Sequence, residues 1–134
     1  MANLIYDAAL SFGKLALIAT GQFPDVLNLG RKPGSPDHYP GKESTNADRM
    51  TVDVCCNTPE GGTGLTAAVE ASEDGATGWK EVGKNSFTLA QMQAGPCQAA
   101  ISPNDLQYLR VSVTASGIFT GGSAEAFLNT YVGK

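Results

Sequence analysis

Charged side chains are scarce in this sequence of 134 residues, at 16% of the chain, where a soluble domain usually has about a quarter. Nine cations stand against thirteen anions, which gives a net charge of −4. The nearest approach to a basic cluster is Arg31-Lys32 followed by Lys42 and Arg49, and acids are mixed among them. A nucleic acid would need clustered cations to replace its counterions. We therefore expect no nucleic-acid partner.

Long hydrophobic runs are missing as well. The longest is Leu15–Ala19, directly after Lys14. It is too short for a membrane span or for the apolar core of a signal peptide. We therefore expect no membrane partner and a protein that is made in a cytoplasm.

Cysteine is limited to Cys55, Cys56 and Cys97. The odd count, and the lack of a C-x-x-C or C-x-x-H spacing, disfavour a disulfide framework and a zinc site. We expect three reduced thiols that act as small buried side chains. In a strand, Cys55 and Cys56 would point to opposite faces.

Catalytic signatures are also absent. His38 is the single histidine, and no G-x-S-x-G elbow accompanies it, as a Ser-His-acid triad would require in many hydrolases. The stretch "PGKES" fails as a phosphate loop because Glu43 follows Lys42 where Ser or Thr is needed. Glu73 and Asp74 could contribute to a calcium site, but their segment lacks the spaced ligands of a known loop. The sequence predicts a protein that is not an enzyme and has no metal or cofactor.

What the chain does contain is a period of two. In residues 50–56, Val52 and Val54 alternate with Thr51 and Asp53, as in a half-buried strand. Residues 64–72 and 108–114 alternate in the same way, with apolar side chains at every second position. The turn cluster "PEGGTG" predicts a hairpin between the strands of 50–56 and 64–72, and residues 108–131 read as a second hairpin.

The remaining segments complete an all-β prediction. Ser86 or Thr88 could cap a short helical turn that extends to Met92. Trp79 is expected to cover one end of the core. About eight short strands separated by frequent turns indicate an antiparallel two-sheet β-sandwich, jelly-roll-like, with one short helical turn.

The length fits a single domain over residues 1–134. It would have an N-terminal arm, residues 1–10, and a long proline-rich loop, residues 31–49. Loops of this length in compact domains are usually functional or disordered. We expect either a solvated loop or a surface that orders against a partner, and the arm either packs as an extra strand or reaches a neighbouring subunit.

Several stretches resemble, in the same order, a family of small capsid cement (decoration) proteins of tailed bacteriophages, of the Bordetella-phage type. The C-terminal stretch "YLRVSVTASGIFTGGSAEAFL" carries the family pattern at Tyr108, Leu109, Arg110, Gly117, Thr120 and Gly122. The N-terminal stretch "LIYDAALSFGKLALI" carries it at Ile5, Tyr6, Asp7, Leu10 and Phe12. "VLNLG" and "GLTAAVEASEDGATGW" match two further family segments. The sequence departs from the pattern at Gly13 and Lys14 and in its long loop.

The resemblance implies a jelly-roll protein on the exterior of the virion capsid. It would be a homotrimer at three-fold or quasi-three-fold positions of the expanded head, bound to the major capsid protein. Candidate interface residues are Leu4, Ile5, Tyr6, Asp7, Arg31, Lys32, His38, Tyr39, Lys42, Arg49, Phe119, Phe127 and Tyr131.

Two other classes of protein stay open. One is a carbohydrate-binding β-sandwich module of a phage tail or receptor-binding protein, for which Trp79 would be the sugar platform. The other is a small hydrolase that depends on His38. Few aromatic residues, 7% of the chain, weigh against the first, and the missing catalytic motifs weigh against the second.

Overall fold

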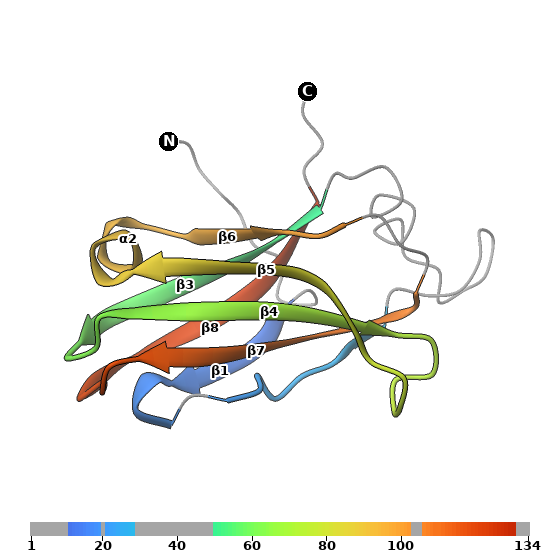
Figure 1. Ribbon diagram of the computed structural model, residues 1–134, viewed down its shortest axis with the longest axis horizontal. Coiled ribbons are helices and arrows are strands. Elements are labelled where there is room, and N and C mark those ends of the chain that lie inside the picture. Colours follow the sequence, from blue (N-terminus) through green and yellow to red (C-terminus); the bar gives the residue numbers. More distant parts are fainter. Residues whose placement is uncertain (1–10, 20, 29–49, 103–105, 131–134) are drawn as a thin grey trace.

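Two four-stranded sheets lie face to face in this protein (Figure 1). The structure, a computed structural model, describes residues 11–19, 21–28, 50–102 and 106–130. Sheet A has the strand order β1-β8-β3-β6 and sheet B the order β2-β7-β4-β5. The strands are β1 (Ser11–Ala16), β2 (Leu27–Asn28), β3 (Met50–Glu60), β4 (Gly64–Ser72), β5 (Lys80–Thr88), β6 (Cys97–Ala100), β7 (Tyr108–Ser116) and β8 (Gly121–Thr130).

This strand order is that of a jelly roll. The first strand pairs with the last, β2 with β7, β3 with β6 and β4 with β5, all antiparallel. The chain is therefore arranged as one long ribbon of four strand pairs, rolled so that successive pairs fall in opposite sheets. Additional pairing of β3 with β8 and of β4 with β7 joins the ribbon to itself. The predicted all-β sandwich is confirmed.

Both predicted hairpins are wrong. The turn at 61–63 connects β3 in sheet A to β4 in sheet B, and residues 117–120 connect β7 in sheet B to β8 in sheet A. Neither β3 with β4 nor β7 with β8 forms a hydrogen-bonded ladder: β3 pairs with β6 and β8, β4 with β5 and β7, and β7 with β2 and β4. The two turns are corners that cross between the sheets.

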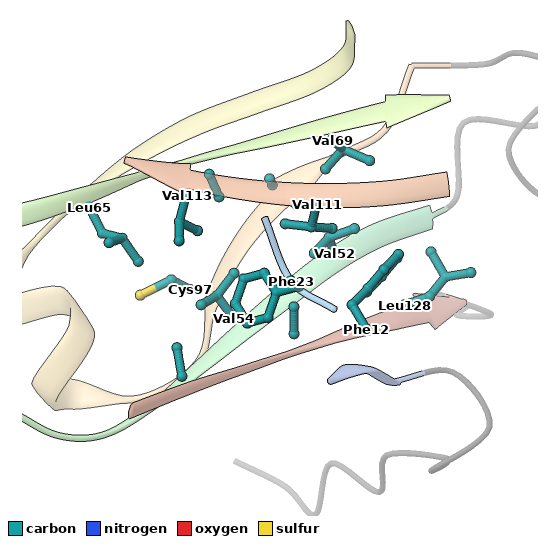
Figure 2. Packing of buried hydrophobic residues seen from close by; sticks show 14 of the residues in the cluster. Phe12, Phe23, Val52, Val54, Leu65, Val69, Cys97, Val111, Val113 and Leu128 are labelled. Carbon is teal, nitrogen blue, oxygen red and sulfur yellow. The ribbon is translucent and has the colours of Figure 1, made fainter. Parts of the chain in front are cut away.

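The core lies between the two sheets (Figure 2). Val52 and Val54 of β3 face Val111 and Val113 of β7, and all four side chains are buried. Alternate side chains on the same strands point away from the core, as the period of two predicted. Phe23, between β1 and β2, is also fully buried, and its amide donates to the carbonyl of Val111 in β7, next to the antiparallel bridge between Gln22 and Ser112.

The single short α-helix of the described residues is α2 (Leu89–Ala94). Thr88 caps it: the Thr88 hydroxyl accepts from the amide of Gln91, and the Gln91 side chain accepts from the amide of Thr88. This reciprocal capping box satisfies two amides at the helix start. Met92 is the buried residue of α2. The prediction of a capped helical turn is confirmed, with Thr88 as the cap. No helix in the described part of the chain is long and apolar enough to cross a membrane.

Candidate functional surfaces

Most of the candidate interface residues lie outside the described residues. These are Leu4, Ile5, Tyr6, Asp7, Arg31, Lys32, His38, Tyr39, Lys42, Arg49 and Tyr131. The N-terminal arm and the proline-rich loop fall in the same ranges. The interface prediction at these positions stays a prediction. Phe119 and Phe127 are within the described part.

Phe119 belongs to the core. Its side chain is 4% exposed, and its ring lies so close to Gly62 that a Cβ there would fall 2.5 Å from it. The neighbouring Ile118 is 83% exposed. In the corner between β7 and β8, Phe119 is therefore buried and Ile118 is exposed. A Phe119 that binds a partner would have to be exposed instead.

The two corners are hydrogen-bonded to each other. The amide of Thr120 donates to the carbonyl of Glu60, and the amide of Thr63 donates to the carbonyl of Ser116. The amide of Leu89, at the start of α2, donates to the carbonyl of Thr63. In the pairing of β1 with β8, Ala16 lies opposite Ser123, so the 3-10 turn η2 (Leu17–Ala19) follows at the same end. We call this end, residues 17–19, 58–63, 89–96 and 117–122, the corner end (Figure 1).

The outer face of sheet A carries Phe127 and a buried carboxylate. Phe127 is opposite Asp53 in the pairing of β8 with β3, and it is half-buried on the side away from the core. Asp53 is 0% exposed. Its carboxylate accepts hydrogen bonds from Thr51 Oγ1 at 2.9 Å and from Asn129 Nδ2 at 3.1 Å, with Gln98 Nε2 at 3.4 Å. Asp53 thereby links β3 to β6 and β8 from outside the core.

The outer face of sheet B carries an ion pair and a stacked ring. Arg110 Nε donates to Glu70 Oε1 at 2.8 Å, and the Arg110 guanidinium lies 4.1 Å from the centroid of the Trp79 ring. Trp79 does not belong to the core cluster, so the prediction that it covers one end of the core is wrong. The cation occupies one face of the indole, which leaves less of the ring for a sugar to stack on.

The turn after β4 is closed by Asp74. Its Oδ1 accepts from the amides of Ala76 and Thr77 and from the Ser72 hydroxyl, and its Oδ2 accepts from Thr77 Oγ1. The two backbone donors, followed by the hydroxyls, hold the pKa of Asp74 well below its ordinary value. The carboxylate considered for calcium binding is thus engaged in forming the turn. Within the described residues, no group of His, Cys, Asp and Glu side chains could hold a metal ion.

None of the three cysteines is in a disulfide. Cys97 is buried, and Cys56 is half-buried against the core. Burial raises the pKa of Cys56 to about 12, and the neighbouring Cys97 and Cys55 add to the shift. Burial, with a smaller effect of Cys55, also raises the pKa of Cys97. Cys55 alternates to the outer face of β3. Cys97 and Cys56 therefore pack with the core as the sequence predicted, whereas Cys55 is half-buried and does not belong to the core cluster.

We expect the stability of the fold to decrease as the pH rises from about 9 toward 12. The unfolded thiols lose their protons near their ordinary pKa of about 8.5, whereas Cys56 stays protonated in the folded state to about 12. The unfolded state then binds fewer protons, so alkali favours it. Urea unfolding at pH 8 and pH 10.5 should show a smaller loss in Cys56→Ala than in the wild type. Cys55→Ala is the control, and an equal loss in Cys56→Ala and the wild type would contradict the assignment.

The chain matches no protein-family model, and no curated protein matches it significantly.

Proposed function

We propose that this protein is a capsid cement protein of a tailed bacteriophage, a non-enzymatic virion protein that binds the outside of the expanded icosahedral head. The proposal rests on the resemblance of the sequence, and one observation of the structure carries it further. Several charged side chains of the described residues form hydrogen bonds or an ion pair within the fold: Asp53 joins strands, Asp74 closes a turn, and Glu70 pairs with Arg110. Within the described residues, these side chains are engaged in the fold, which supports a structural role for the protein.

A cement protein needs no catalytic groups, but it must be rigid. A rigid sandwich over a boundary between shell subunits must be removed before the shell can open there. A ligand that binds only the assembled shell stabilises it by mass action, by about 3 kcal/mol at a hundred times its dissociation constant. If three copies form a trimer at a three-fold or quasi-three-fold position, the second and third contacts benefit from a high effective concentration. Modest contacts with the major capsid protein would then suffice. The protein would be made in the host cytoplasm and added to the head there.

The test is co-sedimentation of the purified protein with expanded, undecorated shells of its own virus. Saturable binding at a fixed ratio to the shell protein is expected, and the ratio identifies the symmetry positions that are filled. Decorated shells should also open at a higher temperature than bare ones. Folded protein that does not sediment with intact shells would refute the proposal. A screen of host surface glycans, with Trp79 fluorescence as the signal, would then test the carbohydrate-binding alternative.

A further inference from the structure

The two most exposed large hydrophobic side chains of the described residues both lie at the corner end. Ile118 is 83% exposed and Ile18 is 66% exposed. Ile118 is at the tip of the corner between β7 and β8, and Ile18 is in η2, which follows the strand paired with β8. Single exposed hydrophobic residues are common on soluble proteins. Two at one end require a second observation before they indicate an interface.

That observation is the distribution of charge. Within the corner end, as defined by its four ranges, Glu60 is the single charged residue. The opposite end of the sandwich has Glu73, Asp74 and Lys80 within the eight residues from 73 to 80. Depletion of charge around exposed aliphatic side chains is the compositional mark of the centre of a protein interface.

The corner end is also preformed. The corners are fixed to each other by the Thr120–Glu60 and Thr63–Ser116 backbone hydrogen bonds. Beside the exposed Ile118, Phe119 is anchored in the core against Gly62. A Cβ on Gly61 would lie 2.8 Å from the carbonyl oxygen of Ile118, so the two turns approach as closely as the backbone allows. A surface that is ordered before binding loses little conformational entropy when a partner covers it.

We infer that the corner end is the surface by which this protein contacts the capsid, with Ile118 and Ile18 as its anchors. The inference rests on the proposed function and adds which part of the molecule contacts the shell. The complementary site on the shell protein is an apolar depression with a donor or cation opposite Glu60, because the corner end offers aliphatic side chains, one carboxylate and no cation. A second copy is a poorer occupant, since a symmetric end-to-end contact would bring two Glu60 carboxylates together.

Three variants test the inference in the same co-sedimentation assay. Ile118→Asp and Ile18→Asp each place a charge on the corner end, and each should weaken binding to undecorated shells by at least about tenfold. Val26→Asp is the matched control because Val26 is an exposed hydrophobic residue, 39% exposed, outside the corner end. It should bind as the wild type does. All three substitutions are on exposed side chains, so urea unfolding should verify that each variant is folded.

The outcomes separate the inference from the function on which it rests. Wild-type binding that is unchanged in both isoleucine variants would overturn the inference and leave the cement function intact. Absence of wild-type binding would overturn both. Sedimentation velocity without shells tests the other occupant: a self-association that Ile118→Asp abolishes would assign the corner end to a second copy and overturn the inference.

Discussion

Gly122→Ala is expected to lower the free energy of unfolding by about 3 kcal/mol, which combines backbone strain with steric overlap. Gly122 has a φ of +101°, and a Cβ there would lie 2.6 Å from the carbonyl oxygen of Thr58 and 2.7 Å from the Cα of Pro59. Both neighbours are backbone atoms of β3, so neither can rotate away. The residue lies where the pairing of β3 with β8 is irregular, between Asn57 and Glu60.

Substitutions at two other glycines separate the cost of backbone strain from the cost of steric overlap. Gly78 has a φ of +69° with no atom within 4 Å of an added Cβ, so Gly78→Ala should cost about 1 kcal/mol from conformation alone. Gly21 has open space and no positive φ, and Gly21→Ala should be neutral or slightly stabilising. The three values are measured by urea unfolding under one set of conditions. If Gly122→Ala costs no more than Gly78→Ala, the close contact with β3 is not what fixes this position.

A large loss at Gly122 would have a consequence for binding. The residue follows the Thr120 amide that is bonded to Glu60, so a displaced β8 would also displace the corner with Ile118. A destabilised Gly122→Ala protein should therefore bind shells more weakly, even where it remains folded.

The period of two in the sequence correctly assigned side chains to faces but failed to assign strands to sheets. It placed Val52, Val54, Val111 and Val113 inward, and the structure agrees. Alternation depends on the pleat of a single strand, so it holds whichever strand lies alongside. Pairing depends on the path of the turn, and "PEGGTG" has the same turn residues whether it closes a hairpin or crosses to the other sheet. What distinguishes the corner is the contact between Phe119 and Gly62, from segments more than fifty residues apart.

The surface residues show a similar limit. The turn "GIFTG" contains two apolar residues in succession, a signal that one of them would be exposed, but the predicted interface residue was Phe119 and the exposed one is Ile118. The larger ring is buried because it fills the space over Gly62, which only the fold creates. Asp53 was assigned to the outward face, correctly, yet its complete burial depends on Gln98 and Asn129 of other strands. Neither neighbour could be identified without the register.

Asp53→Ala is expected to lower the free energy of unfolding by about 3 kcal/mol, because it removes a buried, hydrogen-bonded carboxylate. Thr51 and Asn129 would lose their acceptor, and so would the longer contact from Gln98. A matched control is Glu125→Ala. Glu125 is a half-buried carboxylate that accepts from Ser11 Oγ at 2.8 Å, and its replacement should cost less than about 1 kcal/mol. Urea unfolding of the two variants measures the difference.

Exchanging the carboxylate and the amide of Asp53 and Asn129 tests whether the loss of stability in Asp53→Ala comes from the hydrogen bond between these two residues. Asp53→Asn keeps the shape of the side chain but removes its charge and turns one of its two acceptors into an amide donor, which must face either Asn129 or the Thr51 hydroxyl. The double variant Asp53→Asn/Asn129→Asp restores a donor and an acceptor across the pair. It should recover part of the stability lost in Asp53→Asn, with a coupling energy of about 1 kcal/mol or more. If the two substitutions are simply additive, the carboxylate stabilises sheet A through other contacts, and β8 is not held to β3 by this hydrogen bond.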